Sequence, residues 1–199
     1  SAAELAHRLE RLATPVRVLY VAAHPDDENT QLLTWLARGR NVRAGYLSLT
    51  RGDGGQNLIG AEQRPLLGVI RTHELLAARE IDGAEQWFTA LRDFGYSKSA
   101  DETLEKWGEE RALEQVVRVV RTFRPHVVIT RFPEAGPTHG HHLASARLAR
   151  QAFAAAGDPE RFREHIAGGL KTWTPQRLFY NFPHFWAKRD QEPPAGPRF

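Results

Sequence analysis

The stretch VRVLYVAAHPDDEN, residues 16–29, decides the fold because it joins a buried strand directly to a group of charged side chains. Its first part, residues 16–24, is a near-continuous apolar run, typical of a strand buried on both faces of a parallel sheet. Pro25 and the two aspartates after it favour a turn and a helix start. Ligands of parallel α/β sheets bind beyond the carboxyl ends of the strands, so we expect a site just after this strand.

Helical and strand patterns alternate along the rest of the chain, which predicts βαβ units. Further strands are expected over residues 42–50, 85–91, 126–130 and 177–182. Helices are expected over residues 1–13, around 32–39, over 65–79, after a capping box at Ser99 and Glu102 with helical periodicity up to Phe123, and over 143–153. The sequence therefore predicts an α/β fold: a Rossmann-like, mainly parallel sheet with helices on both faces.

The length of 199 residues fits one ordinary domain with a real core. We expect this domain to cover residues 1–187. The last residues, 188–199, are rich in proline and lack periodicity, so we expect a tail or linker that leads to further domains in the parent protein.

The chain contains no cysteine and no methionine. Without thiolates, any metal site must be built from histidine and carboxylate ligands. Without an initiator methionine, the chain is either processed or trimmed from a longer one. Removal of an export signal fits this composition, so we expect an extracytoplasmic rather than a cytoplasmic location.

The formal net charge is +3, and the basic residues are scattered without interleaved aromatic residues. This distribution argues against a nucleic-acid partner. No apolar run approaches the length needed to cross a bilayer, so we also expect no membrane span.

Two polar clusters follow predicted strands, AHPDDEN after the first and RFPEAGPTHGHH after the fourth. His24 and Asp27 stand three residues apart, a spacing that can converge on one ion such as zinc. A catalytic zinc needs a third protein ligand, which His142 or a neighbouring histidine would supply. Asp26 should diverge from Asp27 and can serve as a general base. Taken alone, the first cluster fits a turn as well as it fits a functional site, and the second fits a surface loop as well as it fits a site. Together they favour a functional site.

The segment AHPDDE after a buried strand, with H-x-x-H downstream, resembles the PIG-L (LmbE-like) family of N-acetylglucosaminyl de-N-acetylases. The resemblance covers residues 16–153. It implies a metal-dependent hydrolase that removes the acetyl group from an N-acetylated amino sugar, giving acetate and a free amine. It also implies a site of His24, Asp27 and His142 that binds Zn²⁺, with Fe²⁺ as the alternative.

The same resemblance implies roles for other residues. Asp26 would be the general base that activates the attacking water, and His139 would stabilise the oxyanion as an imidazolium. Arg71 and Asp93 would contact the substrate, an N-acetyl-sugar-containing small molecule or glycoconjugate. The alternatives are an ordinary solvated ion pair of Arg71 with Glu74, and a turn at Asp93.

The chain departs from the family at Gly140 and His141, where the family usually has Pro-Asp. The departure removes whatever supporting role that aspartate had. It also leaves open whether His141 replaces His139 or His142.

Other interpretations compete with the deacetylase. A non-catalytic, metal-containing carbohydrate-binding module would not need Asp26. A nucleotide-binding Rossmann domain is disfavoured because the first strand leads into HPDDE rather than G-x-G-x-x-G. A metal phosphoesterase is a further alternative.

The loop RGDGG, residues 51–55, is interpreted as a glycine-rich turn, with a place at the rim of a sugar pocket as the alternative. The remaining histidines are expected to be structural or solvated: His7, His73, His126, His165 and His184.

Overall fold

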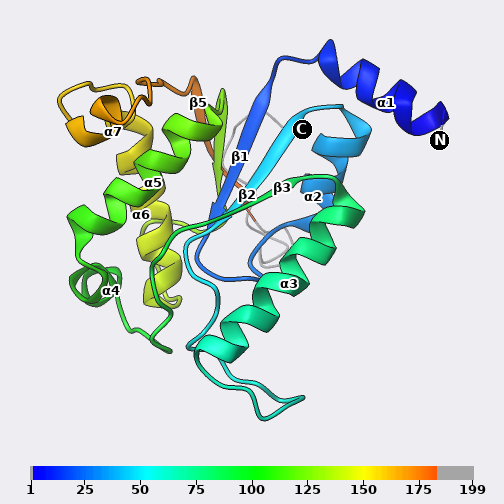
Figure 1. Cartoon of the computed structure of the whole chain (residues 1–199). Helices are drawn as coiled ribbons and strands as arrows, with labels where there is room; N and C mark the ends of the chain where they lie inside the picture. The colour runs from blue at the N-terminus through cyan, green and yellow to red at the C-terminus, as the bar shows by residue number, and fades with distance from the viewer. Residues whose placement is uncertain (1, 183–199) are drawn as a thin grey trace, which may run out of the picture.

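The computed structural model describes residues 2–182, with the backbone alone for residues 2–4, 7 and 8. Its centre is a five-stranded sheet in the order β3-β2-β1-β4-β5, in which every pairing is parallel (Figure 1). The strands are β1 Arg17–Ala22, β2 Arg43–Ser48, β3 Glu85–Phe88, β4 Val127–Thr130 and β5 Arg177–Tyr180. The predicted Rossmann-like α/β fold is confirmed, and each strand falls within the stretch expected for it.

Helices cover both faces of this sheet, as expected. The helices are α1 Ala2–Leu12, α2 Thr30–Thr34, the π-helical turn η1 Trp35–Gly39, α3 Pro65–Asp82, α4 Ala100–Trp107, α5 Glu109–Phe123, α6 Gly140–Ala155 and α7 Arg163–Ala167. Side chains of β1 alternate between the two layers. Leu19 and Val21 pack with α4, α5 and α6, whereas Val18 and Tyr20 pack with α2, η1 and α3.

Local signals set the boundaries of the helices before the second polar cluster. Ser99 caps α4, because its hydroxyl accepts a hydrogen bond from the Glu102 amide at 3.1 Å. Gly108 then divides the helical stretch up to Phe123 in two, since its φ of 74° is left-handed. The periodic apolar positions after Gly108 form α5 and fill the core.

The predicted N-terminal helix forms, but its apolar side does not join the core. Leu5, Leu9 and Leu12 are all exposed in α1, which extends away from the sheet (Figure 1). Within residues 2–182, no helix is both long and apolar enough to cross a bilayer. The expected tail at residues 188–199 lies outside the described part of the chain.

Candidate active site

The sheet order brings the two polar clusters together. Strands β1 and β4 are paired neighbours, so the loops after their carboxyl ends share one edge of the sheet. The ring of His24 lies 5.2 Å from that of His139, 5.1 Å from that of His141 and 5.3 Å from that of His142, measured between centroids. Four imidazoles from two distant segments therefore gather at this edge.

Three of the predicted metal ligands form a compact set. Ligand atoms of His24, Asp27 and His142 all lie within 4.8 Å of one another. The carboxylate of Asp27 is 3.3 Å from Nδ1 of His24 and 3.4 Å from Nε2 of His142. Atoms bound at about 2 Å to one tetrahedral ion lie about 3.3 Å apart, so this spacing and donor chemistry fit Zn²⁺ or Fe²⁺.

The backbone holds the Asp27 carboxylate in place. One of its oxygens accepts hydrogen bonds from the amides of Ala23 at 3.1 Å and His24 at 2.7 Å. Burial alone would raise the pKa of Asp27, but hydrogen bonds from His142 and His24 more than offset burial and leave the pKa lowered. Asp27 is therefore an anion, as a metal ligand must be.

The ring of His142 is fixed on two sides. Phe132 stacks on it with a centroid distance of 3.7 Å and an interplanar angle of 3°. Its Nδ1 is 3.0 Å from the hydroxyl of Thr138, which leaves Nε2 toward Asp27. This arrangement favours His142, rather than His141, as the third ligand beside Asp27.

His141 occupies a different position, behind His24. Its side chain is fully buried, and its Nδ1 lies 2.9 Å from Nε2 of His24. The aromatic rings of Phe94 and Trp107 pack against it at 4.4 and 4.8 Å. Burial, reinforced by the neighbouring histidines, lowers the pKa of His141 to about 2. A neutral His141 can accept the Nε2 hydrogen of His24 and so direct the other nitrogen, Nδ1, toward Asp27. A second group with metal-ligand spacing contains His141 together with His24 and His139.

His139 stands at the N-terminal end of α6. Its Nδ1 accepts a hydrogen bond from the amide of His141 at 3.0 Å, which assigns the ring hydrogen to Nε2. Burial, followed by the charges of His24 and His142, lowers the pKa of His139 to about 4. The ring therefore offers a neutral N–H, and the expected imidazolium stays a prediction.

Asp26 is the accessible carboxylate of the cluster. Its side chain is 66% exposed, and its backbone has a φ of 152°, which L residues rarely adopt. The guanidinium of Arg71 lies 3.1 Å from this carboxylate and also donates to the carbonyl of Pro25. Arg71 is in turn 3.0 Å from Glu74. It is therefore no ordinary solvated residue, because it ties α3 to the loop that bears the predicted base.

Asp93 forms a turn, because its carboxylate accepts the amide hydrogen of Gly95 at 2.8 Å, and it also lies in the cluster. Its carboxylate is 3.9 Å from Nε2 of His24 and 3.7 Å from Nδ1 of His141, and burial raises its pKa. Its amide donates to Asp53 at 3.1 Å. A Cβ on Gly54 would come within 2.5 Å of the Asp93 carbonyl, so the loop RGDGG needs glycine for this approach. The loop is a tight glycine-rich turn beside the site, and its place at the rim of a sugar pocket stays a prediction.

Sequence reasoning missed a buried ion-pair network behind the loop. Arg79 of α3 lies 3.1 Å from Glu28 and 2.5 Å from Asp82, and all three side chains are buried. Glu28 is the last acidic residue of the segment HPDDE. Its carboxylate anchors the loop after β1 to α3 and does not face the site. Nothing in the spacing of the sequence links residues 28 and 79, since the contact depends on how α3 docks.

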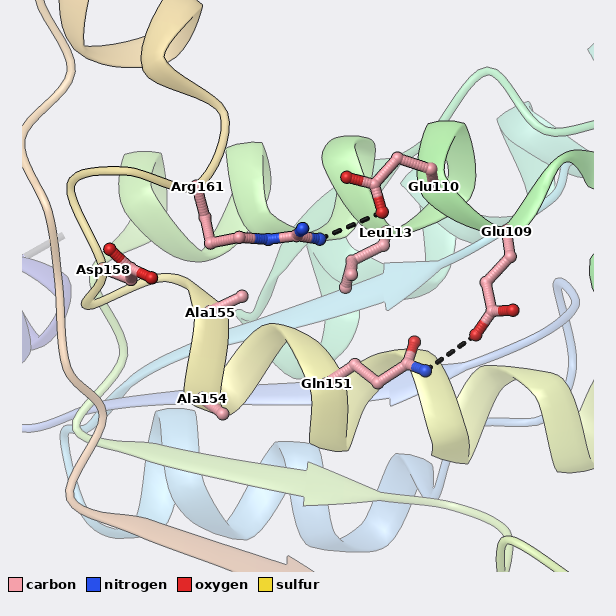
Figure 2. Close-up of a pocket in the computed structure, with 8 residues that line it drawn as sticks. All are labelled: Glu109, Glu110, Leu113, Gln151, Ala154, Ala155, Asp158 and Arg161. Carbon is pink, nitrogen blue, oxygen red and sulfur yellow. Dashed lines mark hydrogen bonds and ion pairs between the residues drawn. The ribbon is translucent and has the colours of Figure 1, made fainter.

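A third group with metal-ligand spacing, Glu114, Glu164 and His165, lies away from this edge. Both ring nitrogens of His165 are already engaged, at 2.5 Å by Glu114 and at 3.2 Å by Arg121. This histidine is structural, as expected. Nearby, a groove between α5 and α6 is bridged by the pairs Arg161–Glu110 and Gln151–Glu109, and its described lining includes no histidine (Figure 2).

Comparison with known proteins finds a matching family and similar enzymes. Residues 19–153 match the PIG-L family, described as GlcNAc-PI de-N-acetylase. A 1D-myo-inositol 2-acetamido-2-deoxy-alpha-D-glucopyranoside deacetylase of Geodermatophilus obscurus is 32% identical over 82% of this chain and 60% of its own length. A mycothiol S-conjugate amidase of Streptomyces coelicolor is 27% identical over 83% of this chain and 60% of its own length.

Solved structures share the fold. The N,N'-diacetylchitobiose deacetylase of Pyrococcus horikoshii aligns with a TM-score of 0.66 at 19% identity, over 82% of this chain and 58% of that one. The conserved protein TT1542 of Thermus thermophilus aligns with a TM-score of 0.58 at 27% identity, over 83% of this chain and 67% of that one.

The chain spans about 60% of the two curated relatives' length. The family match covers most of the chain and includes both polar clusters, and the chain therefore belongs to the PIG-L family.

Proposed function

We propose that this protein is a metal-dependent hydrolase that removes the acetyl group from an N-acetylated amino sugar of the N-acetylglucosamine type. The observation that carries the proposal is the convergence of His24, Asp27 and His142 at the strand ends, with the accessible carboxylate of Asp26 beside them. The names of the relatives support the choice of amide and sugar, because those proteins are deacetylases and an amidase.

A bound Zn²⁺ or Fe²⁺, held by His24, Asp27 and His142, would supply Lewis acidity toward the acetyl carbonyl. Arg71 orients Asp26, and Asp26 takes a proton from the attacking water. The oxygen of that water bonds to the carbonyl carbon at the same time. His139 donates its Nε2 hydrogen to the carbonyl oxygen, where negative charge develops. The C–N bond then breaks, Asp26 returns the proton to the nitrogen, and acetate and a free amine leave.

Two other residues would position the sugar. Arg71 lies 3.1 Å from the Asp26 carboxylate, so its guanidinium would donate to a sugar oxygen of a substrate that reaches Asp26. Asp93 is buried beside His24, so it serves a sugar hydroxyl only where the substrate enters deeply. We therefore assign Arg71 to orienting the base as well as to binding.

A non-catalytic carbohydrate-binding module is the second candidate. The pairing of Asp26 with Arg71 weighs against it, because a binding module has no use for an oriented general base. A metal phosphoesterase uses similar ligands and is separated from the deacetylase by its substrates.

The test is acetate release from a panel of N-acetyl sugars and phosphate esters, with and without added Zn²⁺ or Fe²⁺. We expect metal-dependent acetate release that falls at least about 100-fold in Asp26→Asn, which keeps the shape but removes the base. The control is Asp101→Asn, an exposed aspartate that pairs with Arg147. Metal binding without any acetate release would support the binding module, and phosphate release would support the phosphoesterase.

A further inference from the structure

The outer side of α3 carries a stripe of exposed apolar side chains. Figure 1 shows this helix at the periphery of the fold. Helical periodicity brings five large apolar side chains, 37 to 77% exposed, to one side of it: Leu66, Val69, Ile70, Leu76 and Ile81. Leu67 and Leu75 lie on the opposite side and are buried. The helix is therefore apolar on both sides, although only one side packs into the core.

The loop before α3 adds two more exposed apolar side chains next to the start of the helix. Leu58 and Ile59 are 92 and 97% exposed. The side chain of Asn57 orders this loop. Its Oδ1 accepts hydrogen bonds from the amides of Ile59 and Gly60, both at 3.0 Å, and its Nδ2 donates to the carbonyl of Glu62 at 3.1 Å. An ordered turn thus presents two aliphatic side chains to solvent.

The size of this apolar surface is that of a protein–protein interface. The seven residues together expose on the order of 900 Å², whereas the largest apolar patch of a typical monomer is about 300–600 Å². One partner in a stable interface of standard size buries about 800 Å². The outer side of α3 and the loop before it are therefore large enough to form a dimer interface.

The charges beside the stripe have opposite signs at its two ends. Arg64 stands at the start of α3 and Glu80 in its last turn, about 24 Å apart at a helical rise of about 1.5 Å per residue. Neither side chain has a hydrogen bond or ion pair to any residue within 2–182. A second α3 that runs antiparallel brings its glutamate to Arg64, and the reverse happens at the other end. The surface is therefore complementary in charge to a second copy of itself.

The apolar side chains match in the same antiparallel arrangement. With a two-fold axis beside His73, Ile70 of one copy lies level with Leu76 of the partner subunit, and Leu66 lies beside Ile81 of the partner subunit. Both copies use the same surface, so the pair is closed and leaves no second binding surface free.

We infer that a second copy of this chain covers the outer side of α3 in a two-fold symmetric dimer. The two α3 helices run antiparallel, and Arg64 pairs with Glu80 of the partner subunit at each end. This inference goes beyond the proposed hydrolysis and does not depend on it, because it concerns a side of α3 that carries none of the residues assigned to the candidate active site.

The first experiment is sedimentation equilibrium of the native chain and of Ala77→Glu. Ala77 is exposed in the middle of the stripe, so a glutamate there puts a charge where apolar side chains meet. We expect a native dimer with a dissociation constant of about 10 μM or lower, and a constant at least about 10-fold higher in Ala77→Glu. The matched control is Ala154→Glu, an exposed alanine on α6, which should dimerise like the native chain. Circular dichroism checks that each variant is folded.

The second experiment tests the antiparallel arrangement by exchanging charges. Arg64→Glu places two carboxylates together at each end of the interface, so we expect the dissociation constant to rise about 10-fold. Adding Glu80→Arg to this variant restores the opposite charges and should bring the constant back to within about 3-fold of the native value. Failure of the double variant to recover would overturn the antiparallel pairing.

Three results of sedimentation would overturn the dimer itself. A chain that is monomeric at about 100 μM leaves the stripe to a different protein. A dimer that Ala77→Glu does not weaken has its interface elsewhere. Assemblies that grow beyond two copies with concentration come from a contact that does not close. None of these results bears on acetate release, so the proposed function is tested separately.

Discussion

Among the described residues, two regions gather histidine and carboxylate side chains at metal-ligand spacing, and they differ in how closely these side chains approach one another. At the α5–α7 contact, His165 is bound on both ring nitrogens, at 2.5 Å by Glu114 and at 3.2 Å by Arg121. At the sheet edge, Asp27 stays 3.3 to 3.4 Å from the nearest nitrogens of His24 and His142. The first group is closed by its own partners, whereas the second has the spacing of ligands around one ion.

This difference predicts that metal affinity depends on one region alone. We expect Asp27→Asn or His142→Ala to weaken Zn²⁺ binding by more than about 1,000-fold, because each removes one of three ligands and Asp27→Asn also removes the negative charge. His165→Gln should leave the stoichiometry at one ion per chain. Competition with a chromogenic chelator measures both. A loss of binding in His165→Gln equal to that in Asp27→Asn would reverse the assignment of the two regions.

The closed region should instead determine stability. The guanidinium of Arg121 is buried and donates to the carbonyls of Ala156, Asp158, Phe162 and Arg161 as well as contacting His165. Arg121→Met leaves these carbonyls without their donor, so we expect a loss of about 3 kcal/mol in the free energy of unfolding. Urea denaturation measures it, with Arg150→Met as the control because Arg150 pairs with Glu134 at the surface. Zn²⁺ affinity should be unchanged in both variants.

At the sheet edge, His141 supports the metal ligand His24 from behind, because its Nδ1 lies 2.9 Å from Nε2 of His24. Removing the acceptor for the Nε2 hydrogen of His24, as in His141→Phe, should weaken metal binding about 10- to 100-fold. Phenylalanine keeps the ring that packs between Phe94 and Trp107, so the fold should persist. His141→Gln offers a carbonyl oxygen in place of the nitrogen and should recover part of the affinity. Unchanged affinity in His141→Phe would mean that the ring only fills space.

The contrast between local signals and docking contacts also explains what could be predicted from the sequence. The apolar run before His24 and the alternation of patterns predicted the parallel sheet, because burial on both faces leaves a signal in consecutive residues. The pairing of β1 with β4 then brought the two polar clusters together, as the prediction required. Contacts that depend on docking left no such signal. These include Arg71 with Asp26, Arg79 with Glu28, and the position of His141 behind His24 rather than beside Asp27.

The smallest expected effect is a pH dependence that the histidines of the open region should produce. His141 and His139 have pKa values of about 2 and about 4 in the folded protein, below the usual value of 6.5. Between those values and 6.5 these two groups bind more protons in the unfolded chain than in the folded one, so their contribution to stability falls as the pH drops below 6.5. The pKa of His24 is raised, so His24 contributes with the opposite sign.

We expect the metal-free protein to lose about 2 kcal/mol between pH 6.5 and pH 4.5 through these two groups, measured by urea denaturation. This figure is about half of what the two lowered pKa values alone would give, because solvent screens the half-buried ring of His139 and because the raised pKa of His24 contributes with the opposite sign. His141→Phe should remove much of the slope. The control is His73→Phe, which should keep it, because His73 is exposed on α3 outside the four-histidine cluster.

An equal slope in native protein and His141→Phe would mean that the ring of His141 is protonated, or hydrated, in the folded state. A protonated Nδ1 cannot accept the Nε2 hydrogen of His24, so the two rings would then have to be joined in another way. The position of His141 as a neutral acceptor would have to be abandoned, and with it the reason why Nδ1 of His24 is the nitrogen that faces Asp27.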